Sequence, residues 1–188
     1  MRIVGGKYGS RVLKAPKDDA IRPTSDKLRG AIFNMLRSRG VLDGALAMDC
    51  FCGTGALGIE ALSQGADTCV FVDNSRASFD LAKENAATLK IGSEAEFIFR
   101  DAARMGPRPP NVAARTLVFL DPPYRKNLVP QALESLSQGG WLAADAFCVI
   151  EAEKDFVSAL PPGIAAVDEK FYGETKLILA IASSSSPE

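Results

Sequence analysis

The stretch Leu46-Ala47-Met48-Asp49-Cys50-Phe51-Cys52-Gly53-Thr54-Gly55-Ala56-Leu57-Gly58 decides the fold of this 188-residue chain. Its first five residues are an almost continuous apolar run, which predicts a buried strand. Residues 53–58 then follow the pattern G-x-G-x-x-G, and glycines allow positive φ angles and close approach of the backbone to a ligand. The apolar helix expected at 56–64 follows directly. This order of strand, glycine loop and helix predicts an α/β fold that binds a nucleoside.

An acidic residue after the next expected strand strengthens this prediction. The apolar run 68–72 ends in Asp73, twenty residues after Gly53. A carboxylate at that distance suits a ribose diol, because it can accept hydrogen bonds from both hydroxyl groups. The glycine pattern alone is weak evidence, but in this order of elements it is specific.

A second motif, Asp121-Pro122-Pro123-Tyr124, ends the apolar run 117–120. Two prolines hold the backbone extended and have no N–H to donate. The Asp121 carboxylate and the proline carbonyls are therefore acceptors at the carboxyl edge of a sheet, where open α/β folds bind ligands. With Tyr124 as a flat ring beside them, they suit a planar group with two N–H donors, such as the exocyclic amine of a nucleobase. The alternative is a simple turn after a buried strand.

The chemistry of an exocyclic amine explains why such acceptors are needed. Its lone pair is delocalised into the ring, so hydrogen bonds from its N–H groups to Asp121 and a proline carbonyl would hold the nitrogen towards tetrahedral geometry. An in-line displacement then needs mainly that the nitrogen, the methyl carbon and the sulfur are held close together and aligned. The chain contains no histidine, which excludes histidine bases, serine–histidine–acid triads and histidine metal sites. Methylation at carbon 5 of a pyrimidine needs a cysteine nucleophile, which lies in a Pro-Cys pair in the families that resemble this type. The chain has no Pro-Cys pair, so this reaction is excluded.

The two motifs together resemble the S-adenosylmethionine-dependent methyltransferases that modify exocyclic amines. Residues 49–55 look like their first motif, D-x-F-x-G-x-G. Over almost the whole chain the sequence is similar to one bacterial family, the 16S ribosomal RNA (guanine-966-N2)-methyltransferases. The matching blocks are Arg2-Ile3-Val4-Gly5-Gly6, Arg22-Pro23-Thr24-Ser25-Asp26, Asp49 to Leu62, Asp121 to Tyr124, and Tyr172-Gly173-Glu174-Thr175-Lys176-Leu177. The chain departs from the family at Ser10, where glycine is expected, and at Cys52, where alanine is usual.

The resemblance implies a cofactor, S-adenosyl-L-methionine, and a set of site residues. The catalytic residues would be Asp121, Pro122, Pro123 and Tyr124, and the cofactor-binding residues Asp49, Phe51, Gly53, Gly55, Asp73, Asp101 and Ala102. Asp49 would face the methionine amino group, while Asp101 would accept from the adenine amine and the Ala102 N–H would face an adenine ring nitrogen. Either aspartate could instead cap a loop or a helix. No metal is expected.

The fold class is α/β, with a doubly wound, seven-stranded, mainly parallel sheet of the Rossmann-like class I methyltransferase type. The order 3-2-1-4-5-7-6, with strand 7 antiparallel, is implied by the resemblance. The sequence itself predicts strands at 46–50, 68–72, 95–99, 116–120, 146–151, 164–171 and 175–182, with helices at 56–64, 75–89 and 128–137. A β-hairpin over 1–16 and a helix capped by Thr24 or Ser25 precede them.

Charge is distributed unevenly along the chain. Residues 1–39 carry ten Lys or Arg against three Asp, whereas the remainder carries twelve basic and twenty acidic residues. A second basic cluster (Arg100, Arg104, Arg108, Arg115, Arg125, Lys126) brackets the strand before Asp121. We expect RNA contacts from Arg2, Arg11, Lys14, Lys17, Arg22, Arg104, Arg125 and Lys126. The alternative is a solvated surface. The arm should deliver RNA without building the methyl-transfer site, so changes in it should leave cofactor affinity unchanged.

The domain organisation expected from these features is simple. Residues 1–39 form a basic, RNA-facing extension, residues 40–182 the methyltransferase domain, and residues 183–188 a polar, disordered tail. The four cysteines read as small buried hydrophobic residues in a reducing compartment, the alternative being a zinc site. No signal segment or membrane-spanning run is found in the sequence, so we expect a cytoplasmic monomer.

The function predicted is methylation of the exocyclic N2 amine of a guanine in 16S ribosomal RNA, either free or within a small subunit or assembly intermediate. The choice of guanine rests on the resemblance, because the residues indicate only an exocyclic amine. A DNA or RNA adenine-N6 methyltransferase shares both motifs, although the DNA enzymes usually carry an added recognition region. A nicotinamide-dependent oxidoreductase leaves residues 121–124 unexplained. A catalytically silent RNA-binding module would not need Asp121 and Tyr124.

Overall fold

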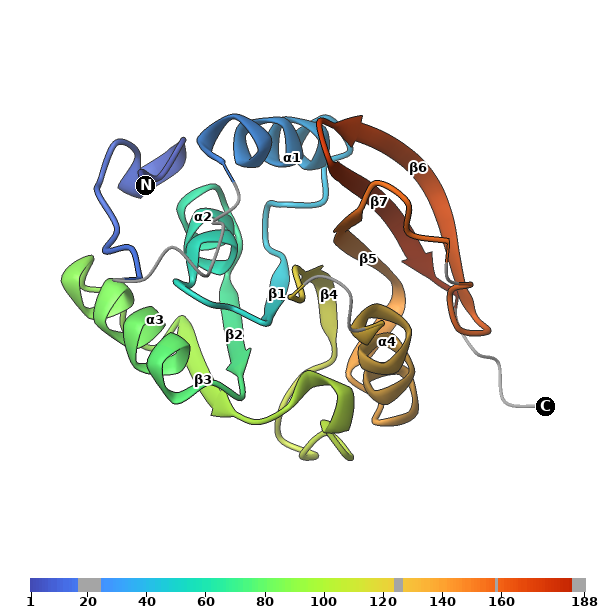
Figure 1. Ribbon diagram of the computed structural model, residues 1–188. Coiled ribbons are helices and arrows are strands. Elements are labelled where there is room, and N and C mark those ends of the chain that lie inside the picture. The colour runs from blue at the N-terminus through green and yellow to red at the C-terminus, as the bar shows by residue number, and fades with distance from the viewer. Residues whose placement is uncertain (17–24, 124–126, 158, 184–188) are drawn as a thin grey trace.

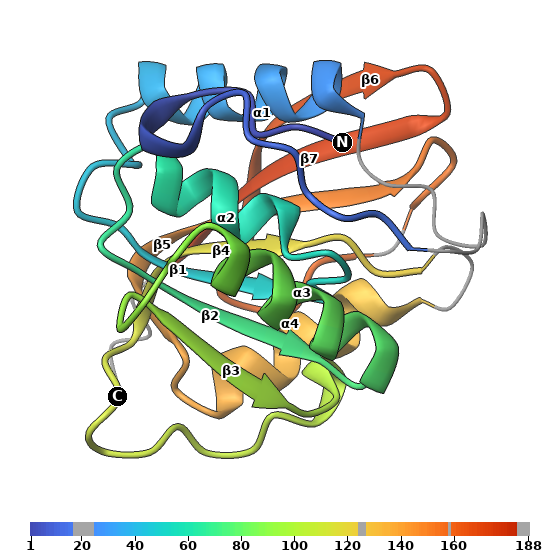
Figure 2. The same cartoon turned by 90° about the vertical axis from the view of Figure 1, so that its left-hand side faces the viewer.

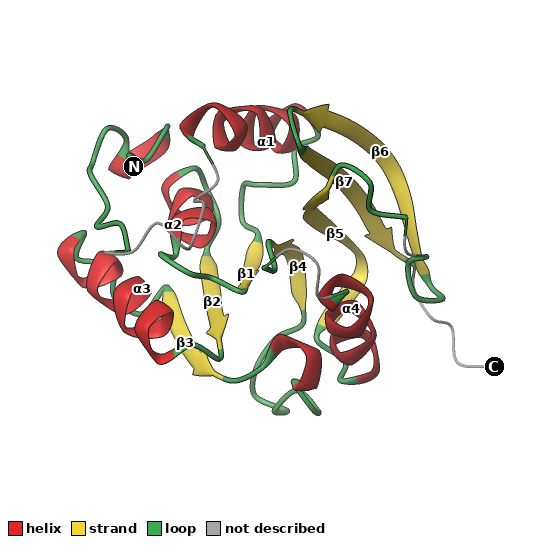
Figure 3. Cartoon of the chain, viewed as in Figure 1, coloured by secondary structure: helices red, strands yellow, loops and turns green. Residues whose placement is uncertain are grey.

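The computed structural model describes residues 1–16, 25–123, 127–157 and 159–183, and within them seven strands form one sheet (Figures 1 and 3). The strands are β1 Leu46–Cys50, β2 Thr68–Asp73, β3 Ala95–Phe99, β4 Arg115–Leu120, β5 Leu142–Glu153, β6 Ile164–Tyr172 and β7 Thr175–Ala182. Their order is β3-β2-β1-β4-β5-β7-β6, and β7 runs in the direction opposite to the other six strands. The expected fold class and strand order are confirmed.

Helices cover both faces of this sheet (Figure 1). They are α1 Asp26–Ser38, α2 Ala56–Ser63, α3 Arg76–Thr88 and α4 Leu128–Gln138, with 3₁₀ turns η1 Gly6–Tyr8 and η2 Ala102–Arg104. Side chains alternate along each strand, so Ala47 faces the core under α1, α2 and α3, whereas Met48 faces the core under α4. Two apolar layers result, as a doubly wound sheet requires.

Helix α1 begins at a side-chain cap, as the sequence predicts. The Ser25 hydroxyl accepts a hydrogen bond from the backbone N–H of Leu28 at 3.2 Å. Leu28, Ile32 and Leu36 form its buried stripe. Thr24, the other expected cap, lies outside the described residues.

The expected N-terminal hairpin is present, although its pairing is short. A single antiparallel bridge joins Arg2 to Val12, and the turn between them contains η1. The ladder stops at Val4 because the backbone N–H groups of Val4 and Gly5 donate instead to the Glu60 carboxylate, both at 2.8 Å. These two bonds attach the N-terminal segment to α2 where the expected turn begins.

The strand expected at 146–151 is longer, because β5 begins at Leu142. Its register against β4 shifts between Arg115 and Leu117, and Asp145 has a positive φ of 59°. Such a bulge lets a strand continue past a residue that interrupts its pattern. The apolar pattern of the sequence therefore predicts only the regular part of β5, after the bulge.

The N-terminal extension shares a hydrophobic core with the rest of the protein. Ile3 and Leu13 are 1% and 2% exposed and belong to the same cluster as Leu117 and Leu179. Apolar packing therefore runs across the division expected at residue 39. The expected tail at 183–188 lies, apart from Ser183, outside the described residues. No helix in the described part of the chain is long and apolar enough to cross a membrane.

Candidate cofactor and methyl-transfer site

The carboxyl ends of the central strands meet at one edge of the sheet. Cys50 is in register with both Val72 and Leu120, so the glycine loop after β1 lies beside the end of β2 and the end of β4. The β2–β3 register pairs Asp73 with Phe99. Four aspartates at positions 49, 73, 101 and 121 therefore lie at or just beyond the same edge, although they are far apart in sequence.

The glycine loop is held by close packing that excludes larger side chains. Gly53 and Gly55 have φ angles of 54° and 77°, which L side chains rarely adopt. A Cβ on Gly58 would lie 2.4 Å from Cε1 of Phe71 and 2.7 Å from the Cys69 sulfur. The third glycine is therefore required for packing of α2 on β2. Phe51 also has a positive φ, 61°, and is half-buried at the start of the loop.

Asp73 fastens this loop to the start of α3. One carboxylate oxygen accepts from the Gly53 N–H at 3.0 Å and the other from the Ser75 N–H at 2.8 Å. Asp73 is 9% exposed. A carboxylate oxygen can accept more than one hydrogen bond, so these contacts leave acceptor capacity for hydroxyl groups.

Asp49 is a buried carboxyl group, 1% exposed, beneath the loop. Its Oδ2 accepts from the Gly58 N–H at 2.8 Å, so it caps the first turn of α2. Burial raises the pKa of Asp49 well above its ordinary value, and the nearby carboxylates of Asp121 and Asp73 raise it further, against the lowering effect of that hydrogen bond. Asp49 therefore caps a helix, the alternative role that the sequence analysis gave for it. A cation bound beside Asp49 would favour the ionised form of this carboxyl group and so oppose the raised pKa.

Asp101 likewise serves as a cap. Its Oδ1 accepts from the Ala103 N–H at 2.9 Å at the start of η2. Ala102 is buried beside it, 2% exposed.

The Asp121-Pro122-Pro123 segment leaves β4 directly beside the glycine loop, because Leu120 is in register with Cys50. Asp121 is half-buried, Pro122 is buried and Pro123 is exposed. Tyr124, Arg125 and Lys126 lie outside the described residues.

The four expected RNA-contacting residues that the structure describes are all at the surface. Arg2, Arg11, Lys14 and Arg104 are exposed, and the Lys14 ammonium pairs with Glu84. Lys17 and Arg22 lie outside the described ranges.

Two arginines are buried, Arg115 of the second basic cluster and Arg29 on α1. Arg115 is only 5% exposed and donates to the Ala113 carbonyl. Arg29 is fully buried and lies 3.8 Å from the Glu60 carboxylate. The buried positive charge of Arg29 therefore lies beside a buried acid.

Sequence reasoning missed two polar residues that connect the N-terminal arm to the domain. Glu60 is fully buried and holds Val4 and Gly5 through their N–H groups. Asn85, on α3, is 2% exposed and bonds to Lys14. A single glutamate within the apolar helix at 56–63 was the signal for the first. Nothing in the pattern around Asn85 marks the second.

All four cysteines are buried and reduced. Burial raises the pKa of Cys148 to about 12 and the pKa values of Cys50, Cys52 and Cys69 well above the usual range, so these thiols stay protonated. In the described ranges no group of three or more acidic, cysteine or histidine side chains could hold a metal ion.

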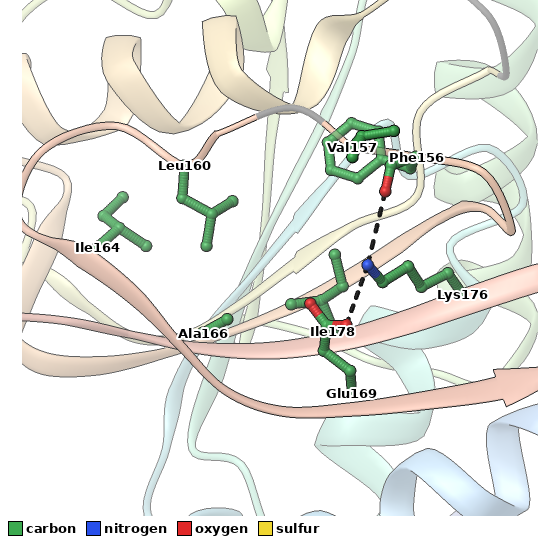
Figure 4. Close-up of a pocket in the computed structure, with 8 residues that line it drawn as sticks. All are labelled: Phe156, Val157, Leu160, Ile164, Ala166, Glu169, Lys176 and Ile178. Carbon is green, nitrogen blue, oxygen red and sulfur yellow. Dashed lines mark hydrogen bonds and ion pairs between the residues drawn. The ribbon is translucent and has the colours of Figure 1, made fainter.

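A separate cavity of about 410 Å³ lies between the loop after β5 and the β6–β7 pair (Figure 4). Its lining residues are Phe156, Val157, Leu160, Ile164, Ala166, Glu169, Lys176 and Ile178. At its rim the Lys176 ammonium lies 3.0 Å from the Glu169 carboxylate and 3.5 Å from the Phe156 carbonyl. None of these residues is among the predicted site residues.

Comparison with known proteins agrees with the fold and the motifs. Ribosomal RNA small subunit methyltransferase D of Escherichia coli (strain K12) is 34% identical over 93% of this chain and 86% of its own length. The putative rRNA methyltransferase YlbH of Bacillus subtilis (strain 168) is 35% identical, over 82% of this chain and 84% of its own. The solved structure of the putative methyltransferase yhhF from Escherichia coli superposes with a TM-score of 0.83, at 32% identity, covering 98% and 99% of the two chains.

The sheet order, the glycine loop and these relatives define a Rossmann-like class I methyltransferase. Residues 1–181 match the family described as "Conserved hypothetical protein 95", and the chain belongs to that family together with the small-subunit ribosomal RNA methyltransferases. The resemblance inferred from the motifs is confirmed.

Proposed function

We propose that the protein transfers a methyl group from S-adenosyl-L-methionine to the exocyclic N2 amine of a guanine in 16S ribosomal RNA. The observation that carries this proposal is the register of β4 with β1, which sets Asp121 and its two prolines directly beside the glycine loop. The choice of small-subunit ribosomal RNA as the substrate rests on the relatives named as methyltransferases of that RNA.

The charges at the sheet edge fit a cationic cofactor. Asp49, Asp73 and Asp101 surround the loop, and residues 49–58 contain no Lys or Arg. A dinucleotide would place a negative pyrophosphate on this set, whereas the sulfonium and ammonium groups of S-adenosylmethionine are attracted to it. When bound, S-adenosylmethionine supplies an electrophilic methyl group.

Each residue at the edge has a proposed part in holding this cofactor. Asp73 accepts hydrogen bonds from the ribose hydroxyls while it fastens Gly53, and buried Asp49 is the anion for the amino group. Asp101 and the Ala102 N–H bind the adenine edge. Gly53 and Gly55 allow the close approach, and Phe51 lies beside them.

The residues after β4 prepare the nucleophile. Asp121 accepts one hydrogen of the guanine amine and the Pro122 or Pro123 carbonyl accepts the other, which holds the nitrogen towards tetrahedral geometry with its lone pair facing the methyl carbon. Tyr124 stacks on the base. Bound S-adenosylmethionine would supply the methyl group and leave as S-adenosylhomocysteine. The methylated, cationic amine would then lose its proton to water, so no base is needed before attack.

Residues 1–39 form the RNA-facing extension and residues 40–182 the catalytic domain. Basic side chains contact the RNA phosphates. They are the exposed Arg2, Arg11, Lys14 and Arg104, together with Lys17, Arg22, Arg125 and Lys126. The partner is 16S ribosomal RNA, free or in a small subunit or assembly intermediate, and such an enzyme works as a monomer in the cytoplasm.

Purified protein tests the proposal directly. It should transfer labelled methyl groups to 16S ribosomal RNA or to small subunits that lack the modification, and nucleoside analysis should yield N2-methylguanosine. Comparing the two substrates identifies the form that the enzyme recognises. N6-methyladenosine as the product, or no product with either substrate, would contradict the proposal.

A further inference from the structure

The side chain of Asn85 joins two segments that are distant in sequence, the N-terminal arm and the glycine loop. Its Oδ1 accepts from the Lys14 backbone N–H at 2.8 Å, and its Nδ2 donates to the Lys14 carbonyl at 3.1 Å. The same Nδ2 donates to the carbonyl of Thr54, within the loop, at 2.9 Å. Asn85 is 2% exposed, so water cannot readily replace these bonds.

Only a carboxamide supplies this set of bonds. The reciprocal pair with Lys14 repeats the N–H and C=O exchange of adjacent antiparallel strands, and the second amide hydrogen goes to Thr54. Alanine would leave the N–H and C=O groups of Lys14 and the buried Thr54 carbonyl without these bonds. Aspartate would turn a carboxylate towards two carbonyl oxygens.

Further contacts hold the arm against the helix that starts at the glycine loop (Figure 2). The Tyr8 N–H donates to the Ser63 hydroxyl at 2.9 Å, and Glu60 holds Val4 and Gly5. The Thr54 hydroxyl lies 3.7 Å from the Met1 sulfur. The arm therefore touches α2, α3 and the loop itself.

We propose that Asn85 is a positioning residue that couples RNA binding on the N-terminal arm to cofactor binding at the glycine loop. The proposal rests on the RNA-binding role given to the arm above. RNA bound to the arm keeps the Lys14–Asn85 pair closed, which holds the Thr54 carbonyl and so the loop in its cofactor-binding shape. Because coupling between two binding sites is reciprocal, the cofactor in turn tightens RNA binding.

Calorimetry of S-adenosylhomocysteine binding, with and without a 16S ribosomal RNA transcript, measures this coupling. In the parent protein the RNA should tighten cofactor-product binding by about fivefold or more, the lower end of typical couplings. In Asn85→Ala the two affinities should become equal while both ligands still bind. Equal coupling in the parent and in Asn85→Ala, or no coupling in the parent, would overturn the proposal.

The matched control is Glu84→Gln, on the same helix. It removes the ion pair with the Lys14 ammonium but leaves the backbone pair with Asn85 in place. RNA affinity can change in this variant, whereas the coupling ratio should remain that of the parent. Loss of coupling in Glu84→Gln would assign the effect to surface charge and overturn the role of Asn85.

Hydrogen exchange on the parent protein provides a test that does not depend on the folding of Asn85→Ala. S-adenosylhomocysteine alone should slow exchange at the Lys14 amide more than at Ile164, whose N–H bonds to Pro161 at 3.1 Å far from the loop. Equal slowing at both amides overturns the coupling even where methylation is observed. This exchange experiment contains no RNA, so its outcome does not depend on RNA binding. Absence of RNA binding in the calorimetry would instead contradict the proposed function.

Discussion

At Asp121 the chain leaves β4 with a carboxylate followed by two residues that cannot donate a hydrogen bond. Asp121→Ala should abolish methyl transfer, because it removes the group that orients the amine, while S-adenosylhomocysteine affinity stays largely unchanged. Labelled methyl transfer and calorimetry measure the two quantities. Asp121→Asn, which keeps one acceptor oxygen, should retain more activity than Asp121→Ala. Near-normal turnover in Asp121→Ala would show that the carboxylate is not the amine acceptor.

The neighbouring Tyr124 should contribute less than Asp121. Stacking of a base on an aromatic ring is worth about 1–3 kcal/mol, so Tyr124→Ala should lower activity by at most about a hundredfold. Tyr124→Phe keeps the ring and should stay close to the parent in the same transfer assay. A large loss in Tyr124→Phe would assign the role to the hydroxyl group instead.

Asp49 should make both stability and cofactor binding depend on pH. Its raised pKa means that the folded protein holds this proton more tightly than the unfolded chain does. Its contribution to stability therefore falls as the pH rises from the ordinary aspartate pKa of about 3.9 to the raised folded value, and is constant above it. A cationic amino group beside Asp49 favours the ionised form, so S-adenosylhomocysteine should bind more tightly as the pH rises through this window.

Calorimetry in two buffers of different ionisation enthalpy would detect the proton that Asp49 releases on binding. The control, Asp49→Asn, should bind without this release and lose the associated pH dependence. A parent protein that releases no proton, with an affinity independent of pH in this range, would show that the amino group does not lie beside Asp49.

At the scale of elements, the packing of α2 on β2 depends on Gly58. Gly58→Ala should lower the free energy of unfolding by about 1–3 kcal/mol, because the new methyl group meets the buried Phe71 ring and overpacks the core. Urea denaturation measures the change. Gly92→Ala is the control, since a Cβ there would lie 3.5 Å from the Glu94 carboxylate, an ordinary contact. Equal effects of the two substitutions would contradict the packing role.

The sequence could predict the helices and central strands because their apolar periods reflect burial on one or two faces. It could also predict that the strand-end aspartates meet, since parallel strands bring their carboxyl ends to one edge. It could not predict that the Val4 and Gly5 N–H groups bond to Glu60, because this acceptor is remote in the chain. The start of β5 was missed for a related reason: its bulge at Asp145 interrupts the pattern.

At the scale of the whole molecule, charge is asymmetric but partly compensated. The buried Arg29 and the paired Lys14 show that not every basic residue of the extension faces a partner. The sequence gives the number of charges, but only the fold shows which are neutralised across elements, as for Arg39, whose guanidinium lies 2.9 Å from Asp168. The proposed RNA-binding surface is therefore smaller than the net charge of residues 1–39 suggests.

Salt dependence measures how many of these charges contact RNA. Each phosphate contact contributes about −0.7 to −0.9 to the slope of log affinity against log salt concentration. Replacing Arg11, Lys14 and Lys17 together by Gln should flatten the slope by about two to three units. Cofactor affinity without RNA should not change, because the backbone pair of Lys14 with Asn85 remains. Lys90→Gln, at the exposed C-terminal end of α3, is the control, and a triple variant with the slope of this control would contradict RNA contact by the arm.

The central claim is that this protein places the N2 methyl group on a guanine of 16S ribosomal RNA. Mass spectrometry of nucleosides from that RNA, in a strain lacking the protein, tests it most directly. One N2-methylguanosine should be lost, restored by a gene for the parent protein and not by one for Asp121→Ala. An unchanged N2-methylguanosine content in the deletion strain would contradict the account.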